Sequence, residues 1–191
     1  MHAGLPLILS LASALTLPAA AQAPSKRVVE PAPKTDAQRD DELLQRPPMA
    51  FYLAKGEPDA CGPGCNEWIA AEGLIDRNAA QRFRAFLQRH GQRKLPVYFH
   101  SPGGALSNAI AIGRVMRQRG LTAAVGRTIP QGCNPLLERE EACDALKRSG
   151  RQLSAELRSA RALCGSACVY ALVGAKVRLS FDPKSVSIHP R

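Results

Sequence analysis

The strongest constraint on the fold is a strand–turn–helix–strand pattern in the middle of the chain. The apolar run at residues 95–99 leads through a Ser-Pro-Gly-Gly turn at 101–104 into small and apolar residues at helical spacing, which stop at Gly120. A second apolar run follows at 121–125. Two buried strands joined by one helix through short connections form a right-handed parallel crossover. The pattern therefore predicts an α/β fold built around parallel strands.

The flanking segments extend this pattern. Residues 51–54 and 68–75 are apolar runs that predict strands, the second broken at Gly73. A helix is expected after Asp76, and its inner face carries four apolar residues, Ala79, Phe83, Phe86 and Leu87. An apolar helix over 166–173 and short strands over 177–181 and 186–188 complete the expected core.

Residues 127–162 interrupt the pattern because they are polar, charged and lack evident strand signals. We expect one helix that begins at Pro135 and ends near Gly150, and a second over 152–162. Together they predict a helical hairpin inserted into the α/β core.

The start of the chain has a different composition. An apolar run at residues 5–18 precedes small residues at 19–21, which is typical of a signal peptide over 1–21. The alternative is an uncleaved N-terminal anchor. Residues 22–48, rich in proline and charge, predict a flexible linker, which leaves one domain over 49–191. We therefore expect a periplasmic or secreted protein with no membrane span after cleavage.

The chain has six cysteines, which in an exported protein favour disulfides. Fifteen connectivities are formally possible, but the cysteines fall in three local sets that we expect to pair: Cys61 with Cys65, Cys133 with Cys143, and Cys164 with Cys168. Zinc is the rival interpretation, disfavoured because the spacing is not that of a zinc ribbon and no histidine is near in sequence, so no metal is predicted. A redox-active pair at 164 and 168 is a further alternative, disfavoured by the three intervening residues.

The formal net charge is +10, which by itself suggests anionic partners. The arginines are scattered over the polar faces of the expected helices and are not interleaved with aromatic residues. A solvated helix surface is therefore favoured over nucleic-acid binding.

Three separate segments hold the parts of a serine hydrolase. Gly103 and Gly104 admit backbone conformations that are closed to other residues, so their turn can aim N–H groups at an anion. Ser166 lies between two small residues at an expected helix start, and the N–H of Ala167 is a second candidate oxyanion donor. His189 closes the last apolar segment and is the candidate base.

Each part also has an ordinary interpretation. The glycine turn resembles many common turns, a serine at a helix start is most often a cap, and a single histidine is most often structural. His90 ends an expected surface helix, and His100 adjoins the glycine turn, where it is placed to line a substrate site.

In this order the segments resemble the ClpP/crotonase-like superfamily, and within it the ClpP-type serine peptidases. The resemblance covers residues 68–191 and runs through Ala-Glu-Gly-Leu-Ile-Asp at 71–76, then 97–104, 165–167, 174–178 and 187–190. It implies repeated ββα units with parallel strands. It also implies Ser166 as nucleophile, His189 as general base, and Gly103 or Gly104 with Ala167 as the oxyanion hole.

The resemblance further implies a peptide or protein substrate and a trimeric or hexameric homo-oligomer; no cofactor is predicted. Two departures stand out. The family's acidic residue lies beyond the histidine, where this sequence has only Pro190 and Arg191, and Asp182 is not expected to replace it. The second departure is the expected helical insertion between the glycine turn and the serine, which is placed to gate or cover the site. The family's C-terminal helices are also expected to be missing, as in a truncated product. The leading hypothesis is an exported serine hydrolase, a peptidase. The alternative is a catalytically inactive binding or assembly module of the same fold, stabilised by disulfides.

Overall fold

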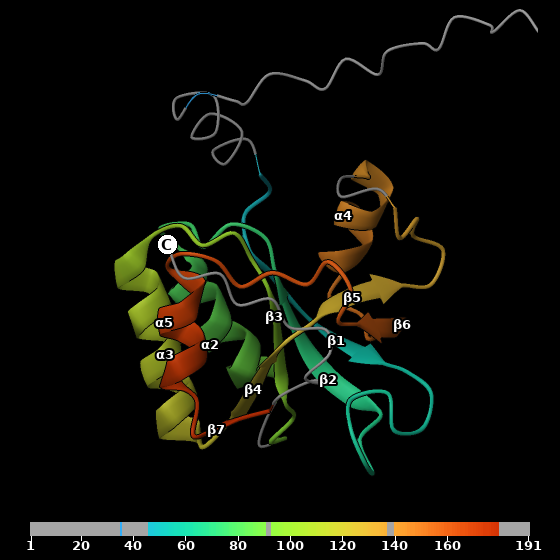
Figure 1. The fold of residues 1–191 in the computed structure, drawn as a ribbon, viewed down its shortest axis with the longest axis horizontal. Coiled ribbons are helices and arrows are strands. Elements are labelled where there is room, and N and C mark those ends of the chain that lie inside the picture. Colours follow the sequence, from blue (N-terminus) through green and yellow to red (C-terminus); the bar gives the residue numbers. More distant parts are fainter. Residues whose placement is uncertain (1–34, 36–45, 91–92, 137–139, 180–191) are drawn as a thin grey trace, which may run out of the picture. The chain divides into compact units, whose positions relative to one another are not determined.

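One mixed sheet of seven strands organises the described part of the chain (Figure 1). The structure is a computed structural model, which describes residues 35, 46–90, 93–136 and 140–179, all within the unit Lys34–Arg191. Across the sheet the strand order is β5-β6-β1-β2-β3-β4-β7. The strands are β1 (Ala50–Lys55), β2 (Glu67–Glu72), β3 (Val97–His100), β4 (Thr122–Val125), β5 (Arg127–Pro130), β6 (Leu153–Arg158) and β7 (Val177–Arg178).

The expected parallel crossover is present. Strand β3 pairs in parallel with β4, with Val97 opposite Ala123, and α3 (Leu106–Arg119) joins the two strands. Parallel pairing continues from β3 to β2 and from β4 to β7, whereas β1 pairs with β2 in antiparallel fashion. Gly120 ends α3 in the left-handed conformation, at φ 63°. The α/β class predicted from the sequence is therefore confirmed.

Three helices cover one face of the sheet. They are α2 (Ala79–Arg89), α3 and α5 (Cys168–Gly174), which lie together on the left of the sheet in Figure 1. The inner face of α2 carries the four apolar residues expected there, and all four are buried. They pack with alternate residues of the central strands, among them Ile69, Val97 and Phe99.

The opposite face of the sheet has its own apolar cluster. The side chains that alternate with those of the helix-covered face, including Tyr52, Trp68 and Tyr98, pack there against Leu153 and Leu157 of β6. The Trp68 indole N–H donates to the Thr128 hydroxyl of β5 (2.9 Å). The segment that covers this second face is therefore the one between β4 and α5.

That segment is not the helical hairpin expected over 127–162. It consists of β5, a single short helix α4 (Glu141–Lys147) and β6; β5 and β6 are antiparallel, with Arg127 opposite Arg158. Strand β6 also extends the sheet by pairing in parallel with β1. Leu153 and Leu157 alternate with exposed polar residues, and this period of two is the signal that the polar composition concealed.

The domain begins before the expected boundary at residue 49. The Leu74 amide donates to the Pro47 carbonyl (3.0 Å), and the Met49 amide donates to the Leu74 carbonyl (2.7 Å). Residues 46–48, assigned to the linker from composition, therefore belong to the fold. The expected signal peptide and most of the expected linker lie outside the described residues. None of the helices in the described part of the chain has both the length and the apolar character needed to span a bilayer.

All three expected cysteine pairs are disulfides. Their Cα–Cα separations are 5.0 Å for Cys61–Cys65, 5.7 Å for Cys133–Cys143 and 5.2 Å for Cys164–Cys168. Cysteines bonded in this way lack the thiolates that zinc requires. Such bonds are typical of proteins from oxidising compartments.

Candidate functional site

The glycine turn after β3 and the serine turn before α5 lie side by side. The Ser101 amide donates to the Leu163 carbonyl (2.7 Å), and the Gly165 amide donates to the Ser101 carbonyl (3.0 Å). A Cβ placed on Gly103 would lie 2.8 Å from the Cβ of Ser166 and 2.9 Å from the Ala167 nitrogen. The structure therefore brings Gly103, Ser166 and Ala167 together, although 59 residues separate the turn at 101–104 from the turn at 164–168 in the sequence.

Ser101 and Ile75 set the shape of the glycine turn. The Ser101 hydroxyl donates to the Gly73 carbonyl (2.7 Å) and accepts the Gly103 amide (3.1 Å). Ile75 then forms a parallel bridge with Gly104: its amide donates to the Gly103 carbonyl (2.8 Å), and its carbonyl accepts the Ala105 amide (2.6 Å). In such a bridge the N–H of the central residue, Gly104, points away from the neighbouring strand.

Two of the three candidate oxyanion amides have no acceptor within the described residues. The Gly103 N–H is taken by the Ser101 hydroxyl, whereas the N–H groups of Gly104 and Ala167 meet no acceptor in the described part of the chain. The geometry therefore distinguishes Gly104 from Gly103 as an oxyanion donor, whereas the sequence left either glycine open for that role.

Ser166 is held in an uncommon backbone conformation. Its φ is 49°, in the left-handed region that residues other than glycine enter rarely, at a cost of about 1–3 kcal/mol. Its side chain is exposed, and it does not cap α5: the N-cap residue is Ala167, with no side-chain cap hydrogen bond. An exposed hydroxyl on a strained turn, beside backbone amides that no described residue accepts, is the arrangement that acyl transfer uses.

The candidate base, His189, lies outside the described residues. Of the two described histidines, His90 packs on the ring of Phe86 (centroids 4.4 Å apart) at the end of α2, and burial followed by the charges of Arg89 and Arg93 lowers its pKa. His100 ends β3, and its Nδ1 accepts the Leu163 amide (3.1 Å). In the neutral ring this bond places the proton on Nε2.

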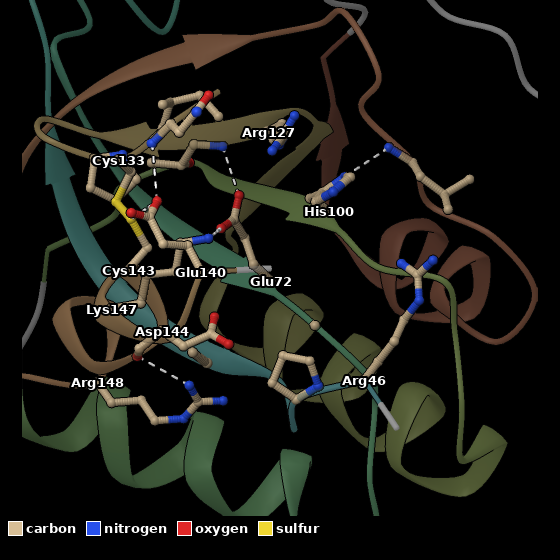
Figure 2. A pocket seen from close by; sticks show the side chains of 18 of the residues that line it. Arg46, Glu72, His100, Arg127, Cys133, Glu140, Cys143, Asp144, Lys147 and Arg148 are labelled. Carbon is tan, nitrogen blue, oxygen red and sulfur yellow. Dashed lines mark hydrogen bonds and ion pairs between the residues drawn. A yellow bond between two sulfur atoms is a disulfide. The ribbon is translucent and has the colours of Figure 1, made fainter. Parts of the chain in front are cut away.

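A polar pocket opens beside the glycine turn (Figure 2). Its volume is about 120 Å³, and His100, Pro102 and Leu163 line one side of it, while β5 and α4 form the other. The charged lining is mixed, with Arg46, Arg127, Lys147 and Arg148 against Glu72, Glu140 and Asp144. A cavity of this size is smaller than the roughly 300 Å³ of common ligand pockets, so it suits one small polar group.

Glu72 anchors the wall of this pocket and was not singled out from the sequence. It is only 5% exposed, and its carboxylate accepts the Thr128 amide (2.7 Å), the Tyr52 hydroxyl (2.8 Å) and the Lys147 ammonium (2.8 Å; Figure 2). Burial, followed by the negative charge of Glu72, raises the pKa of Tyr52 well above its usual value. The signal that the sequence offered for this residue was a glutamate within an otherwise apolar strand.

In the described part of the chain, no group of three or more His, Cys, Asp or Glu side chains is arranged to hold a metal ion.

Comparison with protein-family models, curated proteins and solved structures finds no match to this chain. The resemblance to the ClpP/crotonase-like superfamily therefore stays a prediction, which rests on the motifs and on the geometry described above.

Proposed function

We propose that this protein is an exported serine hydrolase of ClpP-like fold that acts on peptide or protein substrates. Ser166 is the nucleophile, and the amides of Gly104 and Ala167 form the oxyanion hole. The observation that carries the proposal is the exposed Ser166 at positive φ, packed against the glycine turn beside amides that have no acceptor in the described part of the chain.

His189 is the proposed general base. It removes the proton of the Ser166 hydroxyl as the oxygen attacks the substrate carbonyl, and the resulting oxyanion accepts hydrogen bonds from the two amides. The tetrahedral intermediate collapses as the leaving group takes the proton from the imidazolium. Water then hydrolyses the acyl-enzyme with the same histidine as base.

The fold supports the proposed ClpP-like architecture, and the disulfides support the proposed export. The parallel order β2-β3-β4, with helices after β2 and β3, is compatible with the ββα units of the ClpP/crotonase-like superfamily. That resemblance also underlies the proposed trimeric or hexameric assembly. The three disulfides favour an oxidising compartment, periplasmic or extracellular.

A fluorophosphonate probe tests the proposal, because it labels serines that are activated as nucleophiles. We expect the wild-type protein to be labelled, Ser166→Ala to lose labelling completely, and His189→Ala to lose nearly all of it. Ser107→Ala is the matched control, since Ser107 is also exposed and lies at the start of α3, and it should label like the wild type. A correctly folded wild type that does not label would contradict the proposal.

The second candidate function is a binding module without catalysis. The polar pocket beside His100 favours it, because that pocket lies next to the serine turn but does not include Ser166 in its lining. An unlabelled, folded wild type would support this alternative.

A further inference from the structure

The Cys164–Cys168 disulfide spans the serine turn. The two cysteines are four residues apart, with Ser166 midway between them. Cys164 forms a bridge with Ser101 of the glycine turn, whereas Cys168 is fully buried and begins α5 in the helix-covered core. The covalent bond therefore links the residue that pairs with the glycine turn to the first residue of the core helix, one on each side of the strained serine.

Apart from the disulfide, the hydrogen bonds that hold this turn within the described residues are backbone ones. The Gly165 amide donates to the Ser101 carbonyl (3.0 Å), the Cys168 amide donates to the Gly165 carbonyl (3.0 Å), and the Val169 amide donates to the Ser166 carbonyl (3.2 Å). In the described part of the chain no side-chain hydrogen bond supports the exposed Ser166. A left-handed residue persists only where its surroundings impose the conformation.

We propose that the Cys164–Cys168 disulfide is the positioning element of Ser166 and that a dithiol reductant switches the site off by opening it. The inference rests on the proposed hydrolase function, whose nucleophile this bond would hold. Without the bond the turn is free to leave the left-handed region, and the Ser166 hydroxyl then moves away from the Gly104 and Ala167 amides.

The chemistry of the switch is thiol–disulfide exchange. One thiolate of the dithiol attacks the sulfur of Cys164, the less buried partner, and Cys168 leaves as a thiolate that takes up a proton. The second thiolate of the reductant then attacks the mixed disulfide and releases Cys164, which also becomes a thiol. The protein disulfide gains two electrons, and the dithiol ends as its own disulfide. A small-molecule disulfide in excess reverses these steps: it takes up the two electrons, is reduced to thiols and restores the site.

The chain contains a matched control bond. Cys61–Cys65 has the same sequence separation, and it too joins one buried and one partly buried cysteine. It closes the loop between β1 and β2 and packs into the cluster on the opposite face of the sheet. Because the two closed loops are equally long, loss of either bond should raise the conformational entropy of the unfolded chain to the same degree.

The experiment compares Cys164→Ala/Cys168→Ala with Cys61→Ala/Cys65→Ala. Both variants should show similar falls in the urea midpoint. The fluorophosphonate labelling rate at saturating probe should fall about 100-fold in the first variant only, with the half-saturating probe concentration unchanged, because a small displacement of a nucleophile impairs the chemical step. Dithiothreitol should likewise suppress labelling of the Cys61→Ala/Cys65→Ala variant, and reoxidation should restore it. Equal labelling rates in the two variants would overturn the inference.

Hydrogen exchange provides a readout that does not depend on catalysis. The amide hydrogens of peptides that cover residues 101–105 and 164–168 should exchange faster in Cys164→Ala/Cys168→Ala than in the wild type. In the control variant they should exchange at the wild-type rate. If the wild type fails to label, the proposed hydrolase fails, and this exchange difference alone supports the positioning role of the bond. Unchanged exchange in both variants would overturn that role whatever the labelling shows.

Discussion

At the scale of single residues, Gly104 has two roles in the turn between β3 and α3. Its φ of 132° is accessible to glycine, and a Cβ at this position would collide with the carbonyl oxygen of Ile75. The same conformation turns its N–H away from Ile75. The need for glycines was evident from the sequence, but which amide stays available depends on the Ser101 hydroxyl, which binds the Gly103 amide.

Gly104→Ala is expected to lower the free energy of unfolding by about 3 kcal/mol, because backbone strain adds to the collision with Ile75. It should also abolish fluorophosphonate labelling. Gly62→Ala is the control: Gly62 has a similar φ of 115° with nothing near its Cβ position, so it should cost about 1 kcal/mol and leave labelling intact. Urea unfolding measures both values. Equal losses of unfolding free energy in the two variants would contradict the role of the collision with Ile75.

Asp76 illustrates a single carboxylate that joins two elements. The Arg82 guanidinium of α2 bonds this carboxylate and also donates to the Met49 carbonyl before β1 (3.1 Å). Burial raises the pKa of Asp76, but the hydrogen bonds from Arg82 and from the Asn78 amide outweigh it, so the pKa lies below its usual value. A lowered pKa in the folded state means that the ionised carboxylate stabilises the fold.

Asp76→Asn should therefore cost about 1 kcal/mol at neutral pH, a modest value because the pair is partly exposed. The stabilisation is present above the unfolded pKa of about 3.9 and is lost as the pH falls through the lower folded value, so variant and wild type should converge in acid. Urea midpoints between pH 7 and pH 2 test this. Glu156→Gln, which removes an exposed pair with Arg158, should change little at any pH.

At the scale of elements, one buried charge helps to attach the segment β5–α4–β6, in addition to the pairing of β6 with β1 and the packing of Leu153 and Leu157. Glu72 of β2 holds β5 through the Thr128 amide and α4 through Lys147. The composition of this segment indicated only polar surface, because β6 buries just one of its faces and α4 just one residue. Residues 153–158 form a strand because they pair with partners distant in the sequence, in particular with β1, to which β6 is parallel.

Lys147→Met should lower the free energy of unfolding by about 2 kcal/mol, because it leaves the buried Glu72 carboxylate without its cation. The double variant Glu72→Gln/Lys147→Met should recover part of this loss. Lys55→Met removes the more exposed ion pair with Glu67 and should cost less than about 0.5 kcal/mol. Denaturant titrations of these proteins and of the single variant Glu72→Gln test the prediction, and strict additivity in the double variant would argue against it.

At the scale of the whole domain, one sheet separates two apolar clusters. Phe83 lies in the cluster under the helices and Trp68, the single tryptophan, in the cluster under β6. Because adjacent residues of β1, β2 and β3 contribute to opposite clusters, neither cluster can lose its packing without disturbing the strands that support the other. The described domain should therefore unfold as one cooperative unit.

Phe83→Ala should cost about 3–5 kcal/mol through the cavity it creates. We expect the transitions followed by Trp68 fluorescence and by far-ultraviolet circular dichroism to shift together, although the substitution lies on the opposite face of the sheet from the tryptophan. Leu157→Ala, in the tryptophan's own cluster, is the companion variant. Separate fluorescence and dichroism midpoints in either variant would show that the two faces unfold independently.

Local patterns in the sequence were sufficient for the α/β class, the inner face of α2, the end of α3 at Gly120 and the three disulfides, because each of these depends on residues within one element or one turn. The tertiary structure alone decided that residues 127–130 and 153–158 are strands and that Glu72 supports a pocket. It also decided that Gly104, rather than Gly103, has an amide without an acceptor among the described residues. Those outcomes depend on hydrogen bonds and apolar contacts between segments far apart in the chain. Composition and periodicity do not record which distant partner a segment will meet.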